Sequence, residues 1–194
     1  MNFLAHIYLS NEENAIKIGN FIADGIRGKQ YLNYPKDIQK GILLHRQIDT
    51  FTDKHEIVKQ SKRRLYKAYG HYASVIVDIL YDHFLAKNWM NYSDIPLHIY
   101  VNDFYNLLED NFELLPISVK KMMPYMMQDN WLLSYASIDG ITKVLEGMNR
   151  RTNNHSRMNL AVTELKEFYN EFENEFTLFF EDLIIFTKKY LSDN

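Results

Sequence analysis

The segment from residue 71 to residue 89 most constrains the fold of this chain, because it is apolar on almost every side and yet carries acids on its helical stripe. Val75, Asp78, Asp82 and Leu85 recur there in steps of three and four. A helix that is apolar nearly all round is typical of the centre of a bundle. Burying a carboxylate without a partner costs free energy, so the pattern predicts a buried helix whose carboxylates bind a cation.

A second segment repeats this arrangement. Ile38 and Ile42 are followed at helical spacing by His45 and Asp49, so all four side chains lie on one face. For an isolated pair, a buried histidine held by a carboxylate is the ordinary alternative. Acids and histidines on independent core helices make a bound divalent ion the more economical explanation. The candidate ligands are Asp24, His45, Asp49, Asp78, Asp82 and His83.

Polar residues next to these segments are predicted to orient the ligands through hydrogen bonds, as side chains around metal centres usually do. They are His6, His71, Asp53 and His55. Asp24 and Asp78 are also candidate catalytic carboxylates, one of which would act as general base. Arg46, which directly follows His45, is the candidate catalytic contact to a phosphate.

Other arginines are candidate phosphate or partner contacts, because a guanidinium forms paired hydrogen bonds to phosphate oxygens. They are Arg63, Arg64, Arg150 and Arg151. A solvated surface position is the alternative for each of them. Basic residues of this kind would also steer an acidic partner protein toward the site.

Helical periodicity along the whole chain predicts an all-α fold, because no stretch alternates apolar and polar residues between turns. We expect one domain over residues 1–194, a bundle of about seven to nine helices. The last helix carries a long phenylalanine stripe, which we expect in the core. The expected helices span about residues 11–27, 35–52, 54–69, 71–89, 97–112, 118–130, 137–148 and 165–190.

Composition narrows the chemistry. The chain has no cysteine, which excludes disulfides and thiolate ligands and leaves oxygen and imidazole to hold a metal. A net charge of −3 argues against a general nucleic-acid binder. We find neither a basic leader nor an apolar run near the roughly 20 residues of a membrane span, so we expect a cytoplasmic protein without membrane partners.

Several blocks, in this order, resemble the acyl carrier protein phosphodiesterase family: NFLAHIYLS, GNFIADGIRG, GILLHRQIDTFTDKH, SKRRL, HYASVIVDILYDHFLAKNW and LEGMNRR. The resemblance implies an all-helical fold distantly similar to the HD-type metal phosphohydrolases, although the dipeptide Asp82-His83 reverses the usual order. It further implies a hydrolase that depends on a divalent ion, typically Mn²⁺, with Mg²⁺ or Fe²⁺ as other options. Its implied reaction removes 4′-phosphopantetheine from the serine of holo-acyl carrier protein, which leaves the apo form.

Two other functions remain open from the sequence. One is a metal-dependent hydrolase of nucleotides or other small phosphoesters, and the other is a non-catalytic helical interaction module. We expect a long groove beside the metal for the prosthetic arm, lined by some members of an aromatic set, with core packing as the alternative role for each single member. This set is Tyr31, Tyr34, Phe51, Tyr66, Tyr72 and Trp89.

Overall fold

The computed structural model describes residues 1–193, and this part of the chain contains helices, turns and loops but no strand. The predicted all-α class is confirmed. The helices of nine residues or more within it are α2 (Asn14–Ile22), α3 (Lys36–Lys54), α4 (Glu56–Tyr69), α5 (Ala73–Lys87), α6 (Leu97–Asp110), α7 (Ile117–Gln128), α9 (Ile138–Arg151) and α11 (Tyr169–Asp193). Three shorter helices are α1 (Phe3–Tyr8), α8 (Trp131–Ser134) and α10 (Val162–Glu167).

Helix α5 forms the centre of the bundle, as its apolar sequence predicts. Eleven of its fifteen residues are buried, and Asp82 and His83 are among them. The long C-terminal helix α11 packs against α3, α4 and α5 with fully buried aromatic rings such as Phe172 and Phe176. The expected core role of the phenylalanine stripe is therefore confirmed, although Phe168 interrupts the helix between α10 and α11.

Helices α2 and α3 touch backbone to backbone. A Cβ added at Gly19 would collide with the carbonyl oxygen of Ile38, and one added at Gly41 would collide with main-chain atoms of α2. Only glycine permits so close an approach. One turn beyond Gly41 lies His45, and the close packing brings its ring to the main-chain oxygen of Asn20 in α2.

The short helix α1 was not expected from the sequence, because six residues cannot hold a helix in isolation. Asn2 at its start supplies no capping side chain. Asp82 caps it from α5 instead, since its carboxylate accepts hydrogen bonds from the Leu4 and Ala5 amides at 2.7 and 3.3 Å. The buried acid thus holds the helix that carries His6.

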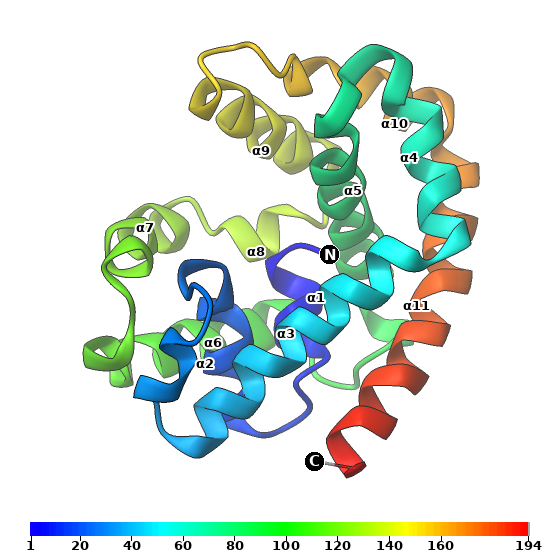
Figure 1. Cartoon of the computed structure of the whole chain (residues 1–194). Helices are drawn as coiled ribbons and strands as arrows, with labels where there is room; N and C mark the ends of the chain where they lie inside the picture. Colours follow the sequence, from blue (N-terminus) through cyan, green and yellow to red (C-terminus); the bar gives the residue numbers. More distant parts are fainter. Residues whose placement is uncertain (194) are drawn as a thin grey trace.

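Helices α9 and α7 stand apart from each other, with α8, α1 and the N-terminus between them (Figure 1). A cleft of about 1300 Å³ opens here, lined by residues of α3, α5, α7, α8 and α9 and by the segments around Met1 and Asp24. Within residues 1–193, no helix combines the length and the apolarity that crossing a membrane requires.

Candidate metal centre

Three side chains from two helices converge at the acidic end of this cleft. His6 of α1 and His45 of α3 are buried, and Asp49 of α3 is half-exposed to the cleft. The Nε2 atoms of His6 and His45 lie 3.4 and 3.2 Å from the two carboxylate oxygens of Asp49. All three ligand atoms lie within 4.8 Å of one another. Asp24, in a short 3₁₀ turn after α2, adds an oxygen 3.2 Å from His45 Nε2.

These spacings fit one coordination sphere. Nitrogen and oxygen ligands bind divalent transition metals at roughly 2.1 Å, so neighbouring ligand atoms lie about 3 Å apart. The donor set of imidazole nitrogens and carboxylate oxygens suits Mn²⁺, Fe²⁺ or Zn²⁺. In the described part of the chain, the buried His6 Nε2 has no hydrogen-bond partner, as expected of a nitrogen whose natural partner is an ion. The residues present therefore fit a divalent metal.

Both imidazoles are held through their other nitrogen. His6 Nδ1 lies 2.8 Å from the side-chain oxygen of Asn20, and His45 Nδ1 lies 2.9 Å from the main-chain oxygen of the same residue. The two rings stack with centroids 4.0 Å apart and planes 19° apart. Metal-ligating histidines commonly have one nitrogen anchored in this way. Here the anchors turn both Nε2 atoms toward Asp49.

Charge in the centre is unevenly shared. Burial and the neighbouring His45 lower the pKa of His6 to about 4, so its ring is neutral at pH 7. Burial also opposes charge on His45, but hydrogen bonds to Asp24 and Asp49 outweigh it and raise the pKa of His45 to about 9. The same bonds lower the pKa of Asp24 and, against burial, that of Asp49. The ionised carboxylates of Asp24 and Asp49 are thus stabilised by a neighbouring cation. Without a metal, this cation is the protonated ring of His45.

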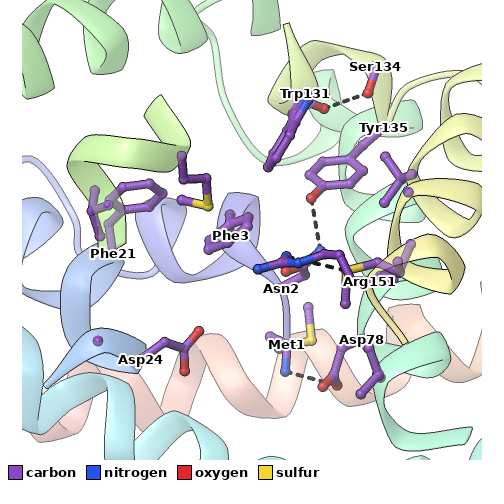
Figure 2. A pocket seen from close by; sticks show the side chains of 18 of the residues that line it. Met1, Asn2, Phe3, Phe21, Asp24, Asp78, Trp131, Ser134, Tyr135 and Arg151 are labelled. Carbon is purple, nitrogen blue, oxygen red and sulfur yellow. Dashed lines mark hydrogen bonds and ion pairs between the residues drawn. The ribbon is translucent and has the colours of Figure 1, made fainter. Parts of the chain in front are cut away.

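The opposite wall of the cleft is basic. Lys143, Arg150 and Arg151 of α9 line the cleft there, and Glu146 is the single acid of this helix among the lining residues. Figure 2 shows Arg151 reaching from α9 toward Asn2, with Asp24 and Asp78 lower in the cleft. None of the three cations forms an ion pair within the described residues. They are therefore available to an anion.

A third part of the cleft is apolar and aromatic. Phe3, Phe21, Met122, Trp131 and Tyr135 line it (Figure 2), and Tyr135 is fixed by a hydrogen bond from Asn2 at 2.8 Å. The aromatic set expected to line the groove does not line this cleft: Tyr31, Tyr34, Phe51, Tyr66, Tyr72 and Trp89 all lie elsewhere. Sequence periodicity could not identify a wall that comes mostly from α1, α7 and α8.

Three predicted ligands on α5 have other partners. Asp78 lines the cleft, but its carboxylate accepts a hydrogen bond from the Met1 ammonium at 3.0 Å. Asp82 caps α1, and burial raises its pKa to about 7. His83 lies between the Tyr135 carbonyl and the Tyr169 hydroxyl, at 2.7 and 2.8 Å. The structure thus leaves these three outside the cluster of His6, His45 and Asp49.

The remaining candidates around the ligands are scattered. Arg46 donates to the carbonyl oxygens of residues 26 and 28 and so fixes the loop after Asp24. Asp53 lines the cleft and pairs with Lys62 at 2.8 Å. His55 lies 3.2 Å from a carboxylate oxygen of α11, and the ring of His71 packs at a tilt against the ring of the next residue, Tyr72.

The four arginines predicted to contact a phosphate or a partner lie in different parts of the structure. Arg64 forms a paired ion bridge to Glu175 of α11, at 2.7 and 2.6 Å, and Ser61 adds a short hydrogen bond to the same carboxylate. Its neighbour Arg63 is 71% exposed and lies 3.5 Å from Glu56. Arg64 therefore joins α4 to α11, and only Arg150 and Arg151 of the predicted set line the cleft.

Two residues of the centre had a larger part than the sequence indicated. His6 was expected beside the ion, but its free Nε2 points at Asp49. Asn20 was not expected at all. The available signal was a single amide in the apolar run IGNFI, because a buried Asn needs several partners.

Comparison with known proteins places this geometry in context. Residues 1–183 match the model of the family described as acyl carrier protein phosphodiesterase. The acyl carrier protein phosphodiesterase of Photorhabdus laumondii is 31% identical over 184 residues, which cover 93% of this chain and 91% of the relative. The corresponding protein of Pectobacterium atrosepticum is 29% identical over 97% of this chain and 98% of its own. No solved structure matches.

Proposed function

The chain belongs to the acyl carrier protein phosphodiesterase family and is a hydrolase, and we propose that it removes 4′-phosphopantetheine from the serine of holo-acyl carrier protein with the help of a divalent ion, Mn²⁺ above all. One observation carries the proposal. A cluster of two imidazoles and carboxylates, which fits a metal, borders the same cleft as Arg150 and Arg151, neither of which forms an ion pair within residues 1–193.

His6, His45, Asp49 and Asp24 would hold the ion. When bound there, it would supply Lewis-acid stabilisation of the phosphoryl charge and would make water more acidic. The HD-type architecture belongs to the same proposal. It is supported by an all-helical chain in which His and Asp side chains from separate helices converge, although the Asp82-His83 dipeptide takes no part in the cluster.

The cleft residues of this chain do the rest. Arg150 and Arg151 of α9 bind the phosphodiester oxygens and orient the phosphorus toward the acidic floor. Asp24 is 75% exposed in its side chain, and its hydrogen bond to His45 lowers its pKa. It is thus ionised at pH 7 and open to water. One oxygen faces His45 and would serve the ion, so the other oxygen of the carboxylate accepts the proton of the attacking water molecule. Asp78 stays a second candidate for this role.

The reaction then balances as a hydrolysis. Water oxygen bonds to phosphorus, the bond from phosphorus to the serine oxygen breaks, and that oxygen takes a proton. The products are a free serine hydroxyl and 4′-phosphopantetheine. The apolar wall of Phe3, Phe21 and Trp131 offers a surface for the arm. A cleft of about 1300 Å³ exceeds the ~300–1000 Å³ of small-molecule pockets, as a substrate attached to a protein requires.

The proposal includes one catalytic domain over residues 1–194, of which residue 194 lies outside the described part. A cytoplasmic location remains a prediction from the sequence. Nucleic acid and membranes are not among the proposed partners. The two alternative functions are a hydrolase of nucleotides or other small phosphoesters and a non-catalytic interaction module.

Mass spectrometry of holo-carrier protein incubated with the purified protein tests the proposal. With Mn²⁺ we expect loss of the phosphopantetheinyl mass, release of the phosphorylated arm, and no reaction after chelation until Mn²⁺ is restored. Hydrolysis of a nucleotide with an intact carrier protein would instead support the small-phosphoester alternative. Absence of both activities, with Mn²⁺ shown to be bound, would favour the non-catalytic module.

A further inference from the structure

We infer that Asn20 is the positioning residue of the metal centre, which selects the imidazole tautomer of His6 and holds the rings of His6 and His45 in register. The inference about the tautomer stands on hydrogen bonds alone. Only its consequence for activity rests on the proposed function.

The hydrogen positions around Asn20 follow from which groups can only accept. Its side-chain nitrogen lies 2.8 Å from the main-chain oxygen of His6 and 2.9 Å from Ser10 Oγ. A carbonyl oxygen accepts and never donates, so the NH₂ group must be at this end of the amide. Ser10 donates its own proton to the same carbonyl at 2.8 Å, and its lone pairs are free to accept from Asn20.

The amide oxygen of Asn20 must therefore face His6 Nδ1, 2.8 Å away. An oxygen there requires a proton on Nδ1. A proton on Nε2 as well would need an acceptor, but this buried atom has no hydrogen-bond partner among residues 1–193, and a buried N–H group without an acceptor is costly. His6 Nε2 is therefore left as a bare lone pair.

That lone pair lies 3.4 Å from an oxygen of Asp49. Two acceptors facing each other at this distance repel unless a cation lies between them. Asn20, itself fully buried, thus prevents the pair from closing as an ordinary hydrogen bond from histidine to aspartate. It keeps the position open for a metal.

The main chain of Asn20 does a parallel task for His45, whose Nδ1 donates to the carbonyl oxygen of residue 20 at 2.9 Å. One residue therefore sets both stacked rings. A side-chain substitution at position 20 separates the two tasks, because it removes the acceptor for His6 and leaves the carbonyl that accepts from His45.

Nitrogen-15 NMR of the histidine rings in the metal-free protein at pH 7 tests the inference directly. In the wild-type protein we expect His6 with a protonated Nδ1 and an unprotonated Nε2. A His6 ring with its proton on Nε2 would overturn the inference, and this measurement needs no variant to fold.

Asn20→Leu has a similar side-chain volume but no acceptor. In this variant we expect His6 to shift toward the tautomer with a proton on Nε2, which can donate to Asp49, while the Nδ1 signal of His45 stays. Ser10→Ala is the matched control, because it removes a hydroxyl from the same network without touching either ring, and it should leave both tautomers unchanged. An unchanged His6 spectrum in Asn20→Leu would contradict the inference.

Mn²⁺ titration followed by electron paramagnetic resonance supplies the second measurement. Loss of a side chain that orients a ligating histidine typically weakens metal binding roughly 10–100-fold, and we expect this range for Asn20→Leu and less than about threefold for Ser10→Ala. Equal Mn²⁺ affinity in Asn20→Leu and the wild-type protein would overturn the positioning role. If the wild-type protein shows the expected tautomer and Mn²⁺ affinity but leaves holo-carrier protein intact, the proposed function fails and the inference stands.

Discussion

His45 with Asp49 on α3 and Asp82 with His83 on α5 present the same residue types from buried helices, yet the two pairs differ in their partners. On α5 the side chains of Asp82 and His83 already have hydrogen-bond partners within the protein. Asp82 accepts from amides of α1, and His83 lies between the Tyr135 carbonyl and the Tyr169 hydroxyl. On α3 the Nε2 atom of His45 lies against the carboxylates of Asp24 and Asp49. The neighbouring His6 Nε2 of α1 has no hydrogen-bond partner among the described residues. Residue type alone therefore does not identify a metal ligand.

The difference also divides the work between the helices. Both acids of α5 have partners within the protein, since Asp82 accepts hydrogen bonds from the first turn of α1 and Asp78 accepts one from the Met1 ammonium. Asp82 thereby positions the helix that carries His6, whereas His45 and Asp49 of α3 are the residues proposed to hold the ion. A buried polar group whose hydrogen-bonding capacity is already met has little left for an ion.

The largest expected effect contrasts the two histidines. His45→Gln should lose Mn²⁺ binding and lower kcat by roughly 10³-fold, because a metal ion supplies several kcal/mol of transition-state stabilisation. His83→Gln should keep kcat within about twofold, since an amide can replace its two hydrogen bonds. Steady-state kinetics with holo-carrier protein and Mn²⁺ titration measure both. Equal losses of kcat and Mn²⁺ binding in the two variants would indicate that His83 of α5 also belongs to the metal centre.

The next effect applies the same criterion to two adjacent arginines. Arg64→Met leaves Glu175 buried without its cation, which should lower the free energy of unfolding by about 3 kcal/mol. Arg63→Met removes an exposed pair at 3.5 Å and should change it by less than about 0.5 kcal/mol. Urea denaturation checks both values. A stable Arg64→Met protein would show that the bridge from α4 to α11 contributes little.

A third effect concerns the pH dependence of stability. Burial raises the pKa of Asp82 from 3.8 to about 7, so between these values the folded protein holds a proton that the unfolded chain has lost. Its contribution to stability is complete below pH 3.8 and falls as the pH rises toward 7. Between pH 5 and pH 7 the free energy of unfolding of the wild-type protein should therefore fall by about 2 kcal/mol more than that of Asp82→Asn.

His6 contributes with the opposite sign, because its pKa is lowered to about 4 and stability from this group grows as the pH rises. It is present in both proteins, so the comparison of wild type with Asp82→Asn removes its contribution. Urea denaturation of the two proteins at pH 5 and pH 7 measures the difference. Parallel pH profiles would show that Asp82 is ionised throughout this range.

The sequence supports the all-α class and the burial of α5 and α11, because their periodicity is long and strong. It also supports His45 and Asp49 as neighbours, since they lie one helical turn apart, whereas Asp24 reaches His45 only because α2 packs closely on α3. It could not distinguish Asp82 from Asp49, because the cap on α1 spans 78 residues of sequence. Asn20 and the aromatic wall were missed for the same reason, as both depend on contacts between helices that no local pattern encodes.

The smallest effect compares two arginines that lack a buried partner. Arg151→Gln should raise KM for holo-carrier protein about tenfold, because a hydrogen bond to a charged group contributes roughly 1.5 kcal/mol and this side chain reaches into the cleft (Figure 2). Arg63→Gln is the control, since it loses a similar charge outside the cleft and acts only on association. We expect less than a twofold change of KM for Arg63→Gln, and this change should vanish at high salt as exposed charges are screened.

An equal rise of KM in both variants, abolished by salt, would mean that Arg151 only steers the partner and that the phosphate binds elsewhere. A rise confined to Arg151→Gln and persistent in salt would place the phosphate opposite His6 and His45, between the basic wall and the acidic floor.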